Sequence, residues 1–246
     1  MSATARAKTG IPGLDEALEG GLLRNFAYSI IGPPGTGKTT MAAQFIFKGA
    51  TQYSESGVFV SLQEPPFVIA NNMIRFGCNL FDVESQGKLV LLDAAPYQER
   101  PGAELKIRGG VLASEPFNLD GLLGAIANAR KKVAAKRCVI DSLDVIAGVY
   151  RSEPEYRYKL IQFFRALSEL ELTTLILTDT PTPNVEKFGV ETILASGCFI
   201  LHNSDNTDAQ TRTMQIQKIR GVKVLKPMLT YKITPDGLEV SPHATS

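Results

Sequence analysis

The sequence predicts an α/β fold, in which a mainly parallel sheet is flanked by helices and is extended near the C-terminus by antiparallel β-hairpin strands. Apolar runs of strand length alternate with segments of helical periodicity over most of the chain, which is typical of a parallel sheet covered on both faces. After about Gly197 closely spaced strand candidates follow one another instead. The 246 residues are 44% hydrophobic, which is enough for a sizeable core and excludes fibrous, collagen-like and disordered chains.

Five apolar runs have the length of buried strands. They span residues 27–31, 58–62, 89–92, 138–140 and 174–177. Between them lie four segments in which apolar residues recur with the 3.6-residue period of a helix. These expected helices span residues 39–49, 67–76, 119–135 and 155–170.

The C-terminal part contains three further strand candidates, at residues 198–202, 211–219 and 229–233. Turn chemistry such as Pro235-Asp236-Gly237 separates or follows them, so we expect antiparallel hairpins at the edge of the sheet. Residues 96–116 contain three prolines without clear periodicity. We expect a long surface loop with a functional role there.

Charge and cysteine usage narrow the classes of function. The formal net charge is +1, so the net charge provides no strong electrostatic attraction to nucleic acid or to an anionic membrane. The three cysteines are far apart and lack CxxC spacing, which predicts buried thiols rather than a zinc site. No leader-like or membrane-spanning apolar run is visible, and we expect a cytoplasmic protein.

The strongest motif is GPPGTGKT at residues 32–39, a G-x-x-x-x-G-K-[ST] phosphate-binding loop that follows an apolar strand and opens a helix. Its glycines let the backbone curl so that N–H groups point at phosphate oxygens. We expect Lys38 to reach the β- and γ-phosphates and Thr39 to place its hydroxyl on Mg²⁺. The predicted nucleotide-binding residues are Gly32, Gly35, Thr36, Gly37, Lys38, Thr39 and Thr40.

Such a site needs an acid at the end of a buried strand to hold the metal shell. Asp141 follows the run 138–140 and is the expected residue. Asp144 remains the alternative, and either acid could instead cap a helix together with Ser142.

Five motifs in order carry a resemblance to a known family: TGIPGLD at 9–15, the phosphate-binding loop, VSLQEPP at 60–66, IDSL at 140–143 and KIRG at 218–221. Together they resemble the KaiC family of the RecA/DnaB-type ATPases, over about residues 8–240. The resemblance implies a RecA-like P-loop core forming one domain at residues 9–241, with flexible ends at 1–8 and 242–246. The circadian clock protein of this family carries two such domains in tandem.

The resemblance also implies ATP and Mg²⁺ as ligands and a homo-oligomeric ring, usually a hexamer, with ATP at each subunit boundary. In the family a Lys and an Arg two residues apart reach the γ-phosphate from the adjacent subunit, and Lys218 and Arg220 match that pair. Alternate residues of a strand point to the same face, so we expect both cations to emerge together where the strand 211–219 ends. A solvated basic strand end is the alternative interpretation.

The chain departs from the family at Gln63, because relatives carry two consecutive glutamates there and the first polarises the attacking water. A glutamine orients a water but does not accept its proton, so we expect slow hydrolysis. Glu64 is the alternative base if the backbone turns at the two prolines that follow it.

Two weaker similarities concern phosphate sensing and phosphorylation. Thr178 is a candidate sensor of phosphate, although a simple strand-end threonine fits equally well. Thr192 lies in the region that is phosphorylated in the clock protein, but the paired serine is missing. Autokinase activity is therefore poorly supported.

The sequence leads to an ATP-binding, slowly hydrolysing enzyme that acts as a nucleotide-dependent oligomeric switch or signalling module. One alternative is a recombinase-like ATPase that binds single-stranded DNA through residues 97–108, where acidic residues offset the basic ones. The other is a scaffold that binds ATP without turnover.

Overall fold

The computed structural model describes residues 5–94, 104–107, 111–116, 118–179, 193–203, 212–223 and 228–242. Its strands are β1 (Arg6–Ala7), β2 (Leu22–Leu23), β3 (Ala27–Gly32), β4 (Gly57–Ser61), β5 (Leu89–Asp93), β6 (Glu104–Ile107), β7 (Val111–Pro116), β8 (Arg137–Asp141), β9 (Thr173–Asp179), β10 (Gly197–Asn203), β11 (Arg212–Ile219), β12 (Met228–Thr234) and β13 (Gly237–Pro242). Its helices are α1 (Leu14–Ala17), α2 (Lys38–Gln52), α3 (Pro66–Ile74), α4 (Leu80–Ser85), α5 (Leu119–Val133), α6 (Glu153–Glu169) and the 3₁₀ helix η1 (Leu143–Val149).

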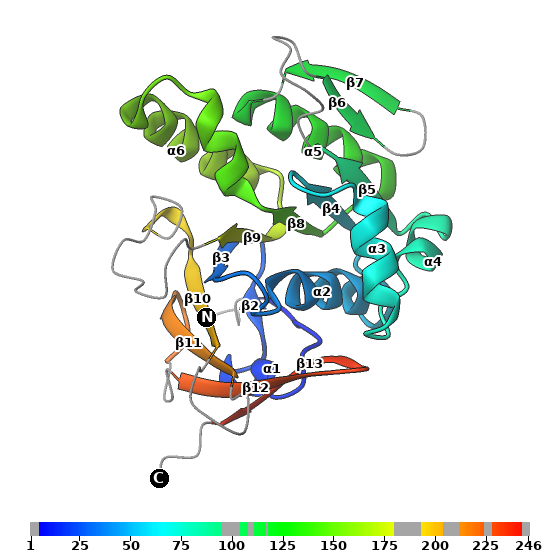
Figure 1. The fold of residues 1–246 in the computed structure, drawn as a ribbon, viewed down its shortest axis with the longest axis vertical. Coiled ribbons are helices and arrows are strands. Elements are labelled where there is room, and N and C mark those ends of the chain that lie inside the picture. The colour runs from blue at the N-terminus through cyan, green and yellow to red at the C-terminus, as the bar shows by residue number, and fades with distance from the viewer. Residues whose placement is uncertain are drawn as a thin grey trace.

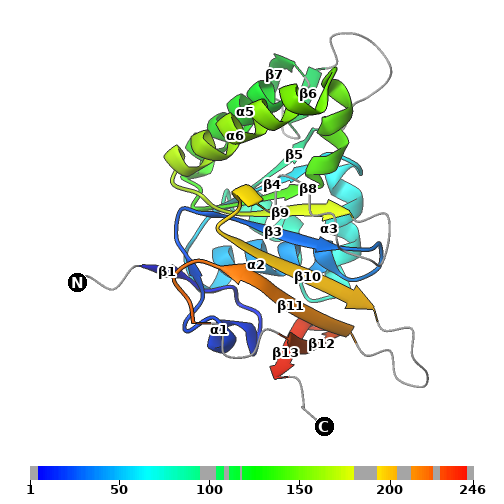
Figure 2. The same cartoon turned by 90° about the vertical axis from the view of Figure 1, so that its left-hand side faces the viewer.

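Within the described residues, eleven strands form one sheet in the order β13-β12-β11-β10-β3-β9-β8-β4-β5-β6-β7. The centre from β10 to β5 is parallel, and both flanks are antiparallel (Figure 2). This confirms the predicted fold class. It adds that β10 pairs parallel with β3 on one side and antiparallel with β11 on the other.

Helices cover both faces of the sheet (Figure 1). One apolar cluster joins α2, α3 and α4 to the sheet, and Phe45 and Phe59 are fully buried in it. A second cluster joins α5, α6 and η1 to the opposite side of the strands, around residues such as Ile140 and Leu160. The central strands are therefore buried on both faces, which explains their continuous apolar runs.

The expectation of a long loop at residues 96–116 is wrong for its described part. Residues of β6 and β7 form an antiparallel hairpin that extends the sheet beyond β5, with Leu92 opposite Ile107. Backbone pairing with β5 supplies the order that the sequence, without a clear period, did not reveal. The rest of that segment lies outside the described residues.

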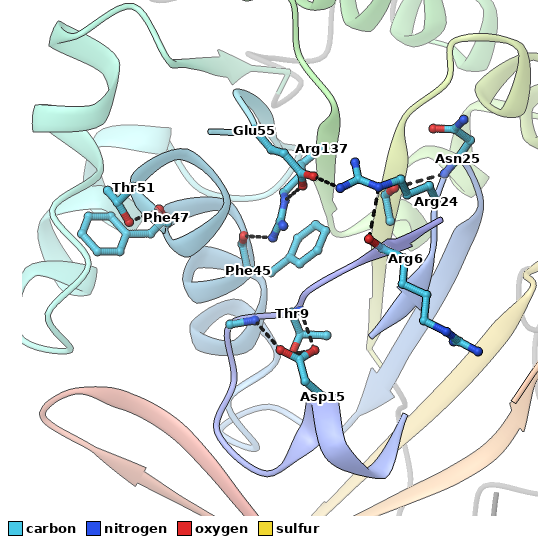
Figure 3. A network of polar contacts seen from close by, with 12 residues as sticks. Arg6, Thr9, Asp15, Arg24, Asn25, Phe45, Phe47, Thr51, Glu55 and Arg137 are labelled. Atoms are coloured by element: carbon cyan, nitrogen blue, oxygen red, sulfur yellow. Dashed lines mark hydrogen bonds and ion pairs between the residues drawn. The ribbon is translucent and has the colours of Figure 1, made fainter. Parts of the chain in front are cut away.

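A buried ionic network ties the start of β8 to α2 and to the chain before β3 (Figure 3). Arg137 is fully buried, and its Nε donates to Glu55 Oε2 at 2.7 Å while Nη1 donates to the Phe45 carbonyl at 2.7 Å. Glu55 also forms an ion pair with Arg24. The guanidinium lies 4.4 Å from the centre of the Phe45 ring, so a charged group is held inside the core by paired charge and stacking.

Three further observations concern the cysteines, metal-binding groups and membrane spans. All three cysteines are buried, and burial raises the pKa of the Cys78 thiol to about 11. No group of three or more His, Cys, Asp or Glu side chains in the described parts of the chain is arranged to hold a metal by itself. In the same parts, no helix has both the length and the apolar character needed to cross a membrane.

Candidate functional site

The phosphate-binding loop leaves the sheet at the end of β3 and enters α2 (Figure 1). Gly35 and Gly37 have positive φ angles of 81° and 93°, a backbone conformation that side chains other than glycine rarely adopt. A Cβ on Gly37 would lie 2.6 Å from Ile233 Cδ1. Tyr231 on β12 donates its hydroxyl hydrogen to the Thr36 carbonyl at 2.6 Å, so the loop is braced from the antiparallel flank.

Lys38 is buried and points back into the loop. Its Nζ donates to the Gly32 carbonyl at 2.7 Å and to the Pro33 carbonyl at 3.1 Å. It also forms an ion pair with Asp179 Oδ1 at 2.7 Å. The ammonium is thus held at the mouth of the loop, where a bound phosphate would be expected.

Thr39, in the first turn of α2, meets Asp141, the last residue of β8. The Thr39 hydroxyl donates to Asp141 Oδ2 at 2.8 Å, although the residues are 102 positions apart in sequence. Burial raises the pKa of the Asp141 carboxyl to about 6, and the hydrogen bond from Thr39 opposes this shift. A hydroxyl and a carboxylate are hard oxygen donors that suit Mg²⁺, so the pair fits the expected metal.

Gln63 follows β4 and faces the same end of the sheet. Its Nε2 donates to Ser142 Oγ at 2.6 Å and, more loosely, to Asp179 Oδ2 at 3.5 Å. Glu64 is exposed, and its carbonyl accepts a hydrogen bond from Ser61 Oγ, which closes a turn after β4. That turn lets both Gln63 and Glu64 line the same cavity.

These side chains surround a cavity of about 570 Å³. Its lining residues are Pro34, Gly35, Gly37, Lys38, Thr39, Thr40, Gln63, Glu64, Phe76, Asp141, Asp179, Arg212 and Ile233. A smaller recess of about 70 Å³ adjoins it between Thr39, Ser61, Gln63, Glu64, Ile69 and Asp141. The structure therefore brings the predicted loop, the predicted acid and both candidate bases together around one cavity.

Sequence reasoning missed four residues of this site. Asp179 pairs with Lys38, Arg212 lines the cavity from the start of β11, and Phe76 and Ile233 give it apolar wall. In the sequence, Phe76 is the last residue of the expected helix 67–76, and Asp179 directly follows the candidate sensor Thr178. Neither position carries a motif, and each joins the cavity only through the fold: Asp179 at the end of β9 and Phe76 just after α3.

Lys218 and Arg220 lie away from the cavity of their own chain. Lys218 is opposite Cys198 on β10, and Cys198 is opposite Ser29 on β3, three residues before the loop begins at Gly32. That register places Lys218 about 10 Å back along the strands. Its Nζ donates to the Ile193 and Ala195 carbonyls.

Arg220 follows in the turn after β11 and is exposed. Its position beyond the strand end means that strand alternation does not fix the direction of its side chain. The two cations therefore sit at the end of the sheet opposite to the phosphate-binding loop.

The remaining candidates are less central. Asp144 accepts a hydrogen bond from the Asp179 backbone at 3.4 Å and is outside the described lining of the cavity. Thr178 Oγ1 is buried, and among the described residues it has no hydrogen-bond partner. Thr192 lies outside the described residues, as do most of residues 97–108.

Comparisons with known proteins identify the relatives of this chain. A family model described as the KaiC ATPase matches residues 7–245. The circadian clock oscillator protein KaiC of Parathermosynechococcus lividus is 32% identical over 239 residues, which cover 96% of this chain and 42% of the relative. KaiC of Picosynechococcus is 33% identical over 240 residues, covering 96% of this chain and 44% of the relative. The chain thus spans less than half the length of these relatives.

A solved structure extends the similarity to the whole fold. A KaiC-like protein from the hyperthermophilic archaeon Pyrococcus horikoshii superimposes with a TM-score of 0.81 and is 33% identical. The match covers 98% of this chain and 100% of the archaeal chain. The RecA-like arrangement expected from the motifs is therefore present over nearly the full sequence.

Proposed function

The chain belongs to the KaiC family of ATPases, and from this premise we propose that it binds Mg·ATP and hydrolyses it slowly as a nucleotide-dependent oligomeric switch. The observation that carries the proposal is the cluster formed by Lys38, Thr39 and Asp141 at the phosphate-binding loop. It combines a cation for phosphate oxygens with two oxygen donors for a divalent metal.

The metal would be held by Thr39 and by Asp141, directly or through its water shell. When bound, Mg²⁺ neutralises charge on the β- and γ-phosphates. The chain's own contribution is to orient: the loop N–H groups fix the phosphates, and Lys38 moves its ammonium onto them. The cavity of about 570 Å³ is of a size that accommodates a nucleotide.

The base of the nucleotide would lie against the apolar part of the wall. Phe76 and Ile233 line the cavity on the side of α3 and β12, and an aromatic ring offers a face for stacking. Stacking is tolerant of base identity, so preference for adenine rests on family membership.

Slow hydrolysis follows from Gln63. Its amide nitrogen is engaged by Ser142 Oγ at 2.6 Å, which leaves the amide oxygen to accept a hydrogen bond from a water near the γ-phosphate. An amide does not take up the proton of that water at neutral pH, so Glu64, which lines the same cavity, is the expected acceptor.

Oligomerisation would complete the site. Lys218 and Arg220 lie at the end of the sheet opposite to their own loop, so they can serve a γ-phosphate only in a neighbouring copy. A contact of this head-to-tail kind closes into a ring, for which the family suggests a hexamer. The presence or loss of the γ-phosphate would then alter the interface.

The direct test is steady-state release of phosphate from Mg·ATP by the purified chain, with its mass measured in ATP and in ADP. We expect slow release, a ring in ATP, and loss of ATP binding in the Lys38→Ala variant. Asp120→Asn, which breaks an exposed ion pair with Lys159, is the matched control. Tight ATP binding without any release would favour the scaffold alternative and contradict the enzyme.

The single-stranded DNA alternative gains no support. Of the segment proposed to bind DNA, the described residues Glu104–Ile107 form β6 within the sheet hairpin. We therefore retain the ATPase as the proposed function.

A further inference from the structure

Asp179 occupies a central position that the proposed mechanism does not use. It is the last residue of β9, and the sheet register sets it directly beside Gly32, the first residue of the phosphate-binding loop. Figure 2 shows β9 running alongside β3 at this end of the sheet. The Asp179 carboxylate lines the nucleotide cavity between Lys38 and Gln63.

The contacts of Lys38 leave no N–H for an incoming phosphate. An ammonium has three N–H groups, and here its acceptors are the Gly32 carbonyl at 2.7 Å, the Pro33 carbonyl at 3.1 Å and Asp179 Oδ1 at 2.7 Å. A phosphate oxygen can be bound only if one acceptor is replaced. Asp179 is the anionic member of the three, so its replacement by phosphate keeps the charge of the ammonium balanced.

We propose that Asp179 is an internal competitor of the nucleotide for Lys38, so that its carboxylate holds the ammonium until the β- or γ-phosphate displaces it. The proposal rests on the proposed function, because it requires a phosphate-bearing nucleotide in this cavity. It assigns to Asp179 the control of nucleotide affinity.

The exchange requires only a side-chain rotation. The backbone of Asp179 is fixed by the β9 ladder and by Asp144 Oδ1, which accepts from the Asp179 N–H at 3.4 Å. After displacement the carboxylate has a partner already in place, because Gln63 Nε2 lies 3.5 Å from Oδ2. The anion is thus passed from one neighbour to another and is not left unpaired.

The burial of the pair sets the size of the effect. The Lys38 side chain is 8% exposed and that of Asp179 is 34% exposed, so the ion pair is stronger than a surface pair but is still partly screened by water. Removing the competing charge should tighten binding on the order of fivefold to tenfold.

The test compares Asp179→Asn with the parent chain. The substitution preserves shape and removes the charge. Asp120→Asn is the matched control, because it removes the same charge from an ion pair of the same 2.7 Å length between Asp120 and Lys159 at an exposed site. Dissociation constants are measured calorimetrically for adenosine, AMP, ADP and ATP with Mg²⁺, and thermal melting verifies that each variant is folded.

We expect Asp179→Asn to bind ADP and ATP about fivefold to tenfold more tightly than the parent, with adenosine and AMP unchanged, since Lys38 reaches only the β- and γ-phosphates. Asp120→Asn should match the parent for all four ligands. Unchanged or weaker binding of ADP and ATP by Asp179→Asn would overturn the inference, as would equal tightening of adenosine. A parent that binds none of the ligands would overturn the proposed function and the inference together.

Discussion

Gln63 is held in an orientation suited to positioning a water. Its amide nitrogen donates to Ser142 Oγ at 2.6 Å, and the side chain lines the nucleotide cavity with Glu64. This hydrogen bond fixes the plane of the amide and therefore the direction of its oxygen. The oxygen can accept a hydrogen bond from the water, but it is too weakly basic to take up the proton that the water loses. The identity of this one side chain therefore limits the rate of hydrolysis in our account.

The substitution Gln63→Glu tests that limit. A carboxylate there can orient the water and accept its proton, so we expect kcat for ATP hydrolysis to rise by about tenfold to a hundredfold. The KM for ATP should rise, because the new carboxylate would face Asp179 in place of the Gln63 amide. Steady-state phosphate release measures both, and Gln63→Ala should be slower than the parent. A Gln63→Glu enzyme no faster than the parent would place the rate limit elsewhere.

Phe76 allows a second test at the scale of one residue. It lines the cavity beside Ile233, whereas Phe67, in the first turn of α3, is 52% exposed and outside the described lining. Loss of the stacking face in Phe76→Ala should weaken ATP binding by about tenfold. Phe67→Ala is the matched control and should bind ATP like the parent. Equal affinities for both variants would contradict the placement of the base.

Strand β11 shows how one element serves two ends of the molecule. Arg212 at its start lines the nucleotide cavity. Lys218 near its end lies at the opposite end of the sheet, level with the start of β3. The strand runs antiparallel to β10, so its eight residues traverse the sheet from one end to the other. In the proposed ring, β11 would therefore connect the interface formed by Lys218 and Arg220 with the nucleotide cavity of the same chain.

The buried ion pair between Glu55 and Arg137, at the start of β8, leads to a prediction about stability. Glu55→Ala would leave the fully buried Arg137 with neither its ion-pair partner nor water. We expect a loss of about 3 to 5 kcal/mol in the free energy of unfolding, measured by denaturant titration. Glu171→Ala removes a comparable partner from Arg130 at an exposed site and should cost under about 1 kcal/mol. Similar losses for the two variants would contradict the role of burial.

How far the elements could be predicted depended on the kind of information each carries. The strands β3, β4, β5, β8 and β9 are continuous apolar runs and were predicted to within about two residues. The β6–β7 hairpin was missed because its order comes from pairing with β5, which local composition does not record. The burial of Arg137 was not predicted, because its ion-pair partner Glu55 is 82 residues away and no local pattern indicates that contact.

In the site, too, some residues are predictable from local sequence and others are placed only by long-range strand pairing. The phosphate-binding loop and Asp141 were predictable because their chemistry requires fixed residue types after buried strands. Asp179 and Arg212 were not, because each reaches the cavity only through the register of β9 and β11 with distant strands. Short motifs thus locate a site, and the long-range topology supplies its remaining walls.

The positions of Lys218 and Arg220 make the assembled ring the functional unit in our account. A chain alone holds the phosphate-binding loop at one end of the sheet and this basic pair at the other. Each catalytic site would combine the loop of one copy with the basic pair of the next. Activity should therefore depend on protein concentration wherever the ring dissociates.

The most direct test is phosphate release by a mixture of two impaired variants. The Lys38→Ala variant keeps Lys218 and Arg220 but lacks the lysine of its own phosphate-binding loop. The Arg220→Ala variant keeps an intact loop but lacks the arginine of the basic pair. In an equimolar mixed ring about one interface in four combines an intact loop with an intact Arg220. We predict that the mixture releases phosphate from Mg·ATP faster than the two variants measured separately. A mixture no faster than their average, or an Arg220→Ala variant with the parental rate, would contradict a site shared between neighbouring copies.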